Sequence, residues 1–404
     1  MSAPELLEAK FGLPRGVRFC ARCVISNQRP SSTVEFEHTP DSKKETIHFD
    51  AAGVCDACRF AELKDTHVDW KERERELLDL LARHRRSDGG YDVLVPGSGG
   101  KDSVYASHLL KHKYGMNPLT VTWAPHIYTE VGWRNFQSWI HAGFDNYLHT
   151  PNGRVHRTLT RLAFENLLHP FQPFIFGQKA FPPKFAAQAG IPLVIYGENE
   201  VEYGNPHAEA ATPRRDARYF TREHRIEEMH LGGVRVPELA RHGVTVKDLE
   251  PYIPADPSVL TEKKIDVHYL GYYLKWVPQE CYYYAVEHAG FEANTERTEG
   301  TYSKYNSIDD RIDGLHYFTT YIKFGLGRAS YDAAQEIRNH HLTRAEGVTL
   351  VRRFDGEVPR KWLKENLDYM GITETRFWEL IDQFRSPHLW QRVGDTWVLR
   401  HQVS

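Results

Sequence analysis

Hydrophobic residues between positions 91 and 200 follow two alternating patterns along the chain. Short apolar, partly β-branched runs predict buried strands at 91–96, 119–123, 146–148 and 191–196. Amphipathic stretches predict helices from Asp102 onward, over 133–142, over 155–168 and around 183–189. This alternation predicts an α/β fold, with a Rossmann-like parallel sheet that is covered by helices on both faces.

The pattern changes on both sides of this central region. Residues 67–86 carry an apolar stripe opposite a charged face, which predicts a helix that connects the N-terminal part to the main domain. From Thr301 onward we expect a mainly helical region whose last part, 390–399, forms a strand pair. The expected parts are therefore residues 1–60, a linker helix at 61–90, an α/β domain with a substrate insertion at 91–300, and a helical region at 301–404.

Four of the five cysteines form two Cys-x2-Cys pairs near the N-terminus, Cys20 with Cys23 and Cys55 with Cys58. Each pair can direct two thiolates to one tetrahedral ion, and four cysteines are a common structural zinc site. Disulfides are the alternative, but the sequence lacks the apolar core of a secretion signal. We expect structural Zn²⁺, with an iron–sulfur cluster as the minor alternative and a short hairpin between the pairs. The fifth cysteine, Cys281, is expected to be a buried core thiol in a helix at 279–288.

Composition limits the classes of function. The formal net charge at pH 7 is −3, which argues against a general nucleic-acid-binding surface. The chain contains no run of 18 apolar residues, so membrane insertion is not expected. We expect a cytoplasmic protein, and the sequence leaves a homo-oligomer open.

A glycine-rich turn, Pro96-Gly97-Ser98-Gly99-Gly100, lies between the first predicted strand and the next helix. The backbone N–H groups of such a turn and the dipole of the following helix favour a bound anion. The chain continues as Lys101-Asp102-Ser103, whereas a Walker loop has Ser or Thr directly after its lysine. The string from Ser98 to Ser103 instead resembles the PP-loop of ATP pyrophosphatases, a HUP-like superfamily in which this loop holds the pyrophosphate end of ATP.

Ligands of open parallel sheets bind beyond the carboxyl ends of the strands. This rule brings three segments to one crevice: 97–103, 122–125 and 197–200. Glu198 is a candidate Mg²⁺ ligand there because Mg²⁺ takes oxygen ligands, and a solvated loop carboxylate is the alternative. The resemblance to PP-loop enzymes implies that Thr122 and Trp123 touch adenine, while core packing explains Trp123 equally well.

Two further segments are rich in charged residues, and the sequence allows two interpretations of each. The arginine-rich stretch 205–225 is either a loop over an anionic substrate or a solvated surface. After Thr301, charged residues share short spans with Tyr317, Phe318 and Tyr321, so we expect some of them to face a crevice. An ordinary amphipathic helix with surface ion pairs is the alternative. The charged residues concerned are Lys304, Asp309, Asp310, Asp313, Lys323, Arg328 and Asp332.

The combination of motifs is more specific than any one of them. In order, the chain carries the two cysteine pairs, the loop 96–103, Tyr-Gly-Glu-Asn at 196–199, Tyr-Leu-Gly-Tyr-Tyr at 269–273 and Tyr-Ile-Lys-Phe-Gly-Leu-Gly-Arg at 321–328. Over roughly residues 17 to 360, this series resembles the N-acetyl sugar amidotransferase family of bacterial lipopolysaccharide O-antigen and flagellar sugar biosynthesis, a branch of the PP-loop superfamily.

The resemblance implies an ATP pyrophosphatase-type ligase. It would adenylate an oxygen of an activated N-acetyl sugar or sugar carboxylate, and would displace AMP with ammonia from a separate glutaminase partner. ATP and Mg²⁺ would be required. The expected ATP-binding residues are Pro96, Gly97, Ser98, Gly99, Gly100, Asp102, Ser103, Thr122, Trp123 and Gly197. The expected catalytic residues are Lys101, Asp102, Glu198, Lys304, Asp310 and Lys323.

Two other functions remain open from the sequence. Some tRNA thiolation enzymes also join cysteine pairs to a PP-loop, but they typically need further cysteines near that loop, and this chain has only Cys281 beyond the N-terminal four. A non-catalytic nucleotide-binding protein whose zinc module docks a partner is the other alternative. Release of pyrophosphate would separate an enzyme from a binding protein.

Overall fold

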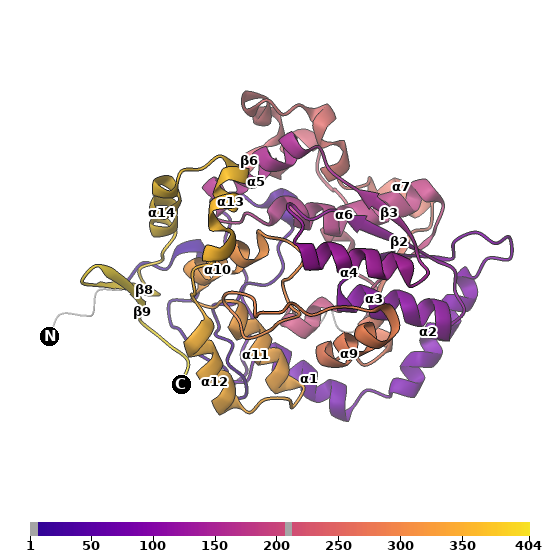
Figure 1. Cartoon of the computed structure of the whole chain (residues 1–404), viewed down its shortest axis with the longest axis horizontal. Coiled ribbons are helices and arrows are strands. Elements are labelled where there is room, and N and C mark those ends of the chain that lie inside the picture. The colour runs from indigo at the N-terminus through magenta and orange to yellow at the C-terminus, as the bar shows by residue number, and fades with distance from the viewer. Residues whose placement is uncertain (1–6, 207–211) are drawn as a thin grey trace.

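The molecule is built around a five-stranded sheet in which every neighbouring pair of strands is parallel (Figure 1). The computed structural model describes residues 7–206 and 212–404. The strands, in the order β3-β2-β1-β4-β7, are β3 (Asp145–His149), β2 (Pro118–Trp123), β1 (Val93–Pro96), β4 (Leu193–Tyr196) and β7 (Asp266–Tyr269). The predicted parallel α/β fold is confirmed. The strand β7 was not predicted, because its four residues lie inside an aromatic stretch without a clear period.

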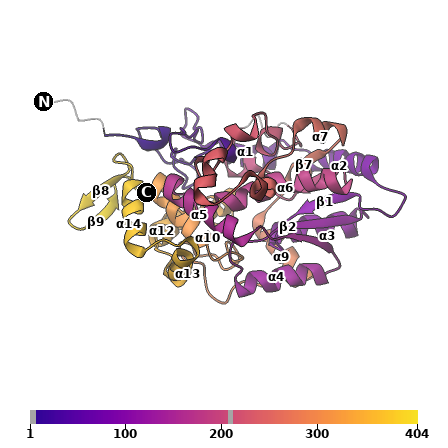
Figure 2. The same ribbon diagram turned by 90° about the horizontal axis from the view of Figure 1, so that it is seen from above.

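The two faces of the sheet are buried by different helices, which explains why its strands are apolar on both sides. Val93 and Val95 of β1 pack with the helix that follows the glycine loop, whereas Leu94 packs on the opposite face with the long helix α6. Figure 2 shows α3 and α9 on one side of the strands and α6 on the other. The carboxyl ends of the strands, and the loops that follow them, are thereby left free to form a site.

The helices predicted at 67–86, from Asp102, at 133–142, 155–168 and 279–288 are present close to their expected bounds, whereas those at 56–66, 257–262 and 270–273 were not predicted. Their bounds are α1 (Asp56–Thr66), α2 (Trp70–His84), α3 (Lys101–His108), α4 (Glu130–His141), α5 (Gly153–Leu167), α6 (Gln172–Ala189), α7 (Pro257–Glu262), α8 (Leu270–Tyr273) and α9 (Pro278–Ala289). The helix α6 begins about ten residues before its predicted segment, since Pro182 and Pro183 inside it disguise a continuous helix. Cys281 is buried in α9, as predicted.

Short turns complete the central and N-terminal parts. They are η1 (Lys10–Gly12), η2 (Glu35–Glu37), the π-turn η3 (Leu109–Lys113), η4 (Glu200–Tyr203), η6 (Ala217–Tyr219), η7 (Ile226–Glu228), η8 (Val236–His242) and η9 (Val246–Tyr252), with the small hairpin β5 (His230–Leu231) and β6 (Val234–Arg235). Residues 207–211 of the arginine-rich stretch lie outside the described residues.

The C-terminal region is mainly helical, as predicted, and ends in a strand pair (Figure 1). Its elements are α10 (Asp313–Phe324), α11 (Arg328–Arg338), α12 (Arg344–Phe354), α13 (Arg360–Met370), α14 (Glu374–Gln383), β8 (Trp390–Val393) and β9 (Thr396–Leu399). The expectation of helix from Thr301 is wrong for residues 301–312. The Ser303 side chain there accepts hydrogen bonds from the N–H groups of Tyr305 and Asn306, which favours turns over helix.

The N-terminal module is not a hairpin, contrary to our expectation. Within the described residues, the segment between the cysteine pairs contains only isolated bridges, such as Pro30 with Thr46, and no strand. Pro30 has no N–H to continue a ladder. The module packs instead against Ala333, Ala334 and Val351 of the C-terminal helices. None of the helices in the described parts of the chain is long and apolar enough to cross a membrane.

Candidate functional site

The glycine loop is held in a shape that only small residues permit. Gly99 has φ +83°, and a Cβ atom there would lie 2.7 Å from the Cα of Phe136. A Cβ at Gly97 would lie 2.1 Å from the Cβ of Ser103. The helix α3 begins directly after the loop, and no side chain in the described parts of the chain caps its N-terminus. Its first N–H groups and its dipole are therefore available to an anion.

The side chains beside the loop form a compact charged group. Lys101 Nζ lies 2.5 Å from Asp102 Oδ2, and Trp276 Nε1 donates a hydrogen bond to Asp102 Oδ1 at 2.8 Å. Asp102 is therefore fixed by a lysine and an indole on opposite oxygens. Ser103 Oγ donates to the carbonyl of Gly100 at 2.9 Å, which stabilises the transition from loop to helix.

Two glutamates after β4 face this group but have opposite electrostatics. Burial and the charge of Asp102 raise the pKa of Glu198 to about 7, and Tyr203 donates a hydrogen bond to its carboxylate. Burial also acts on Glu200, but Lys179 and Arg215 lower its pKa to about 2. Arg215 Nη2 lies 2.6 Å from Glu200 Oε1. Glu200 is thus already neutralised by protein cations, whereas the pair of Asp102 and Glu198 would be stabilised by a further cation.

The loop stands between two cavities that share Ser98, Gly100, Asp102 and Glu198. The smaller cavity, of about 210 Å³, lies over the carboxyl ends of β1, β2 and β4, and Trp123, Tyr196 and Tyr269 contribute aromatic walls. The larger cavity has a volume of about 510 Å³ and is bounded by the N-terminal module, the α5–α6 junction and the C-terminal helices. An arrangement of this kind can hold two molecules on opposite sides of one anion-binding loop.

Most of the predicted nucleotide-site residues lie around the smaller cavity. They are Pro96, Gly97, Ser98, Gly100, Asp102, Ser103, Trp123 and Gly197, while Gly99 lines the larger cavity. Thr122 is an exception: it is fully buried, and its hydroxyl accepts a hydrogen bond from Asn146 Nδ2 at 3.0 Å. Val121 lines the cavity instead, because successive strand residues point to opposite faces.

The catalytic residues expected from the C-terminal region divide into two groups. Lys323 lines the larger cavity, as do Asp309 and Asp313. Lys304 is exposed, donates to the carbonyl of Thr295 and lines neither cavity, so the structure does not bring it to the site. Asp310 is also away from the cavity. It is 3% exposed and accepts hydrogen bonds from the backbone N–H groups of His126 and Ile127, which gives it a structural role in the 301–312 turn region.

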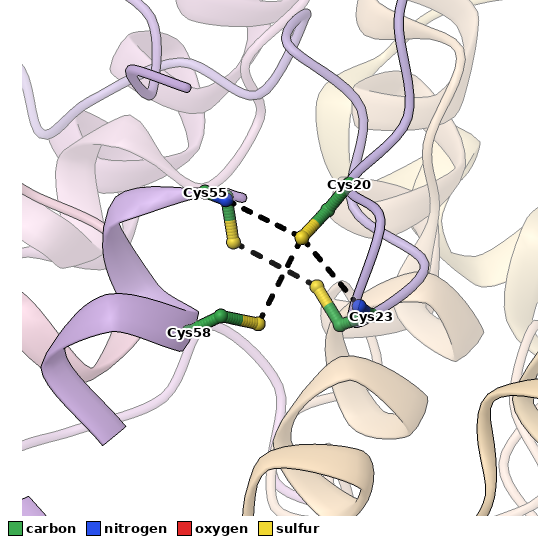
Figure 3. A group of neighbouring side chains, drawn as sticks. All are labelled: Cys20, Cys23, Cys55 and Cys58. Carbon is green, nitrogen blue, oxygen red and sulfur yellow. Dashed lines mark hydrogen bonds between the residues drawn. The ribbon is translucent and has the colours of Figure 1, made fainter. Parts of the chain in front are cut away.

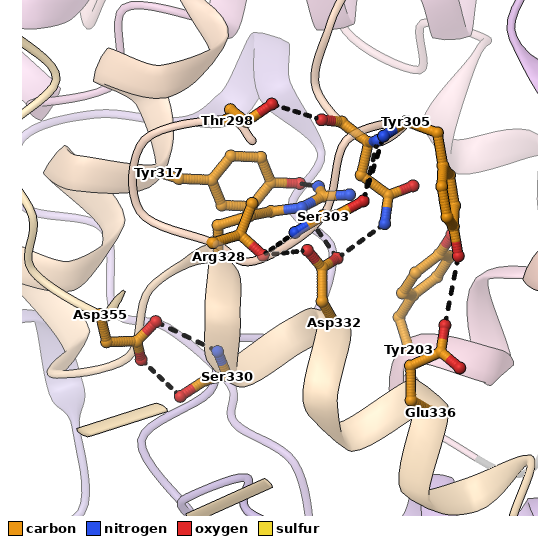
Figure 4. Close-up of polar contacts among 12 residues, drawn as sticks. Tyr203, Thr298, Ser303, Tyr305, Tyr317, Arg328, Ser330, Asp332, Glu336 and Asp355 are labelled. Carbon is orange, nitrogen blue, oxygen red and sulfur yellow. Dashed lines mark hydrogen bonds and ion pairs between the residues drawn. The ribbon is translucent and has the colours of Figure 1, made fainter. Parts of the chain in front are cut away.

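A polar network on α10 and α11 forms part of the cavity wall (Figure 4). Figure 4 shows the guanidinium of Arg328 lying between the Tyr317 ring and Asp332, with Arg328 Nε 3.0 Å from Asp332 Oδ1. Burial and the opposing charge of Arg328 act on the neighbouring Asp313, whose pKa rises to about 7. Asp309 reaches the glycine loop, where a hydrogen bond from Ser98 opposes the effect of burial on its pKa. These carboxylates therefore border the loop from the C-terminal side.

Several residues that line the larger cavity could not be identified from any pattern in the sequence. Glu35, His38 and Lys44 come from the irregular segment between the cysteine pairs, and Lys179 comes from the middle of α6. None belongs to a motif or a periodic pattern. The charged residues after Thr301 did give a signal, since dense charge beside aromatic residues correctly predicted that some of them face a crevice.

The four N-terminal cysteines converge as predicted (Figure 3). All four Sγ atoms lie within 4.8 Å of one another, with Cys20 to Cys58 at 3.9 Å and Cys23 to Cys55 at 3.7 Å. Sulfur ligands at about 2.3 Å from one tetrahedral ion would be separated by similar distances. The N–H group of Cys55 also donates to Cys20 Sγ at 3.3 Å, which favours a thiolate. The set therefore fits a single metal ion better than a multi-iron cluster, whose ligands stand further apart.

One family model and one curated relative match parts of the chain. Residues 299–403 match the family model of the LPS biosynthesis protein WbpG-like, C-terminal domain. An uncharacterized protein of Methanocaldococcus jannaschii, MJ1599, is 34% identical over 84 residues, and the match spans 21% of this chain and 29% of that relative.

Three solved structures have low overall similarity. The NH3-dependent NAD synthetase from Campylobacter jejuni has a TM-score of 0.27 at 14% identity and covers 49% of this chain and 93% of its own. The tRNA thiolase NcsA from Methanococcus maripaludis has a TM-score of 0.32 at 13% sequence identity, and the match covers 83% of this chain and 86% of NcsA. The NMN synthetase from Francisella tularensis has a TM-score of 0.30 at 13% identity, and the match covers 76% of this chain and 98% of the synthetase. Residues 299–403 are thus similar to the C-terminal domain of WbpG-like LPS biosynthesis proteins, which agrees with the resemblance to lipopolysaccharide biosynthesis expected from the sequence.

Proposed function

We propose that the protein is an ATP-dependent sugar amidotransferase of surface-polysaccharide biosynthesis. The observation that carries the proposal is the position of the glycine loop between two cavities, one over the strand ends and one bordered by the WbpG-like region. ATP would occupy the smaller cavity, with its phosphates at the loop, and an acetamido sugar would occupy the larger one. The two substrates would then meet at Ser98, Gly100 and Asp102, which border both cavities.

The proposed reaction has two steps. The amide oxygen of the acetamido group attacks the α-phosphorus, the bond to pyrophosphate breaks, and an O-adenylyl imidate forms. Ammonia then adds to the imidate carbon, and AMP leaves as the amidine forms. A sugar carboxylate would react in the same way to give an amide. Mg²⁺ bound with ATP would supply charge stabilisation on the phosphate oxygens.

Specific residues would assist the first step. The N–H groups at the start of α3 would stabilise the charge that develops on pyrophosphate, with Lys101 beside them. Asp102 and Glu198 would hold the cation, which accords with the raised pKa of Glu198. Trp276 would keep Asp102 in position through its hydrogen bond. Ammonia would come from a separate glutaminase, a partner that the family resemblance implies.

The spacing and burial of the cysteines weigh against the alternative function, tRNA thiolation. The N-terminal four have the spacing of a single-ion site, and Cys281 is 1% exposed and lines neither cavity. A sulfur carrier near the loop would need an accessible thiol. We propose zinc as the ion of the N-terminal site, in a structural role.

The proposal is tested by supplying the protein with ATP, Mg²⁺, ammonium and candidate acetamido sugars. We expect AMP and pyrophosphate in equal amounts, together with a sugar product that carries one more positive charge than the acceptor, because an amidine is protonated at neutral pH. Electrophoresis detects the charge, and NMR identifies the amidine carbon. A neutral carboxamide would assign the sugar-carboxylate reaction instead. ADP and orthophosphate as direct products, or turnover that needs tRNA and a sulfur donor, would contradict the proposal.

A further inference from the structure

One wall of the larger cavity is basic, and neither the nucleotide chemistry nor the proposed catalytic groups account for it. We call this the basic wall and define it as Lys44, Lys323, His38, His169 and His316. These residues come from three distant parts of the chain: the segment between the cysteine pairs, the α5–α6 junction and α10. They nevertheless lie close together, since the ring centroids of His38 and His169 are 6.2 Å apart and those of His169 and His316 are 5.2 Å apart.

The two lysines of the basic wall have only neutral hydrogen-bond partners. Lys323 is 5% exposed, and its ammonium donates to the carbonyl of Leu167 at 2.6 Å. The ammonium of Lys44 donates to Thr33 Oγ1 at 2.8 Å. Within the parts of the chain that the structure describes, neither ammonium forms an ion pair with a carboxylate. Each ammonium has three donors, so both retain capacity for an acceptor in the cavity.

The nearest carboxylate, Glu35, is already engaged. Its oxygens lie 3.4 Å from His38 Nδ1 and 3.6 Å from His169 Nε2, and Gln172 Nε2 donates to it at 3.1 Å. These contacts lower the pKa of Glu35 despite its burial. A single carboxylate shared by two histidines and an amide cannot also neutralise two ammonium groups.

The lack of a carboxylate partner adds to the effect of burial on the pKa values of the two lysines. Burial lowers the pKa of Lys323 well below its usual value, and the neighbouring Lys44 lowers it further. Burial also lowers the pKa of Lys44 to about 8, although Glu35 opposes the shift. In addition, His316 Nδ1 is buried beside the cavity without a partner among the described residues. A bound anion would satisfy these donors and favour the charged form of both lysines.

We propose that the basic wall binds an anionic oxygen group of the acceptor, a phosphoryl group or a carboxylate, while the reacting group of the same molecule lies at the glycine loop. That the anion belongs to the acceptor rests on the proposed function, whereas the presence of an anion site in the cavity does not. The acceptor is therefore an acidic sugar derivative, and a neutral acetamido sugar is a poor substrate.

The test measures binding directly, without turnover. The full-length protein is first saturated with an ATP analogue that cannot be cleaved between the α and β phosphates, so that the glycine loop is occupied. UDP-glucose, which offers phosphoryl groups, and glucuronate, which offers a carboxylate, are then titrated separately by calorimetry. We expect one of them to bind, and Lys44→Met and Lys323→Met each to weaken that binding at least about tenfold, the effect of losing one charge-assisted hydrogen bond.

Matched controls separate the site from general effects. Lys43→Met removes the adjacent, exposed lysine and should leave the affinity unchanged. Unchanged affinity for the ATP analogue shows that each variant is folded, and Lys44, which is only half-buried, provides a test that does not disturb the core.

The outcomes assign the anion or overturn the site. Binding of UDP-glucose assigns phosphoryl groups, and binding of glucuronate assigns a carboxylate. Failure of both to bind the parent protein, or equal binding by the lysine variants, would overturn the proposal. If the anion binds through the lysines but ATP is never converted to AMP and pyrophosphate, the anion site stands and the proposed reaction fails.

Discussion

The two sides of the glycine loop differ in charge and in how the chain builds them. At the loop, Glu198 borders both cavities and carries a raised pKa, which a cation bound with the nucleotide would lower. Further into the larger cavity, the basic wall holds Lys44 and Lys323, whose pKa values are lowered and whose ammonium groups have no carboxylate partner among the described residues. The nucleotide side comes from neighbouring strand ends of one sheet, whereas the acceptor side needs the N-terminal module and the C-terminal helices to meet. The nucleotide side is therefore formed by the sheet itself, whereas the acceptor side forms only when the N-terminal module and the C-terminal helices pack together.

The largest expected effect is on the glycine loop that separates the two sides. Gly99→Val would place a branched side chain against the backbone of Phe136 at a positive φ, and would close the loop to phosphate. We expect formation of AMP from ATP to fall by about 10³-fold, as for the loss of transition-state hydrogen-bond donors. Gly153→Ala, at a helix start where a Cβ meets nothing within 4 Å, is the matched control. Normal turnover by Gly99→Val would show that this loop does not hold the phosphates.

The next effect concerns the cation. Glu198→Gln keeps the shape of the side chain but removes its charge, so we expect kcat to fall about 100-fold and the Mg²⁺ requirement to rise. Acceptor binding, measured as above, should remain unchanged because Glu198 is not part of the basic wall. Equal losses in acceptor binding and in kcat would mean that the two sides of the loop are not separable.

The four-cysteine site should affect the acceptor side more than the nucleotide side. Cys58→Ser would remove one of the four ligands of the proposed ion, and the segment that carries Lys44 would lose its anchor. We expect the acceptor KM to rise at least about tenfold, while the Kd for the ATP analogue changes less than about threefold. Cys281→Ala, which removes a thiol outside the cluster, is the control. Metal content by mass spectrometry identifies the ion. If Cys58→Ser weakened ATP binding as much as acceptor binding, the cysteine site would not act mainly on the acceptor side, and the prediction would be contradicted.

A smaller effect is expected in stability. The pKa of Glu198 is about 7 in the folded protein and 4.5 in the unfolded chain. As the pH rises, the unfolded chain therefore releases this proton before the folded protein does. Stability contributed by this group is therefore lost with rising pH across that window, by up to about 3 kcal/mol. Denaturant unfolding at pH 5 and pH 7 should show this loss in the parent relative to Glu198→Gln. Mg²⁺ with ATP should reduce it, and a parallel pH dependence in both proteins would refute the assignment.

The smallest effect is expected for Lys304→Ala. The side chain is exposed and donates to a backbone carbonyl outside the cavity. We expect kcat and KM to stay within about twofold of the parent, as for most surface substitutions. A large loss would require the 301–312 segment to move Lys304 into the cavity during turnover.

The nucleotide side could largely be predicted from the sequence, whereas most of the acceptor side could not. The strand before the glycine loop could be predicted because its apolar run, the turn and the helix start lie within twenty consecutive residues. The four cysteines could be predicted from their spacing. Lys44 and His169 could not, since each lies in a segment without periodicity and gains its meaning only from a distant neighbour such as Lys323. Thr122 and Lys304 line neither cavity for a related reason: a local pattern does not fix which face a side chain presents.

The packing of the cysteine site has a consequence for how the protein is made. Arg344 donates to the backbone carbonyl of Cys23, and Ala333, Ala334 and Val351 bury the cluster. These partners leave the ribosome almost 300 residues after Cys58, so the cluster spends most of synthesis without its cover. A metal ion can enter during that interval, before the C-terminal helices dock. The acceptor pocket is then the last part of the molecule to form, and a chain truncated before α11 would present a finished nucleotide loop beside an open N-terminal module.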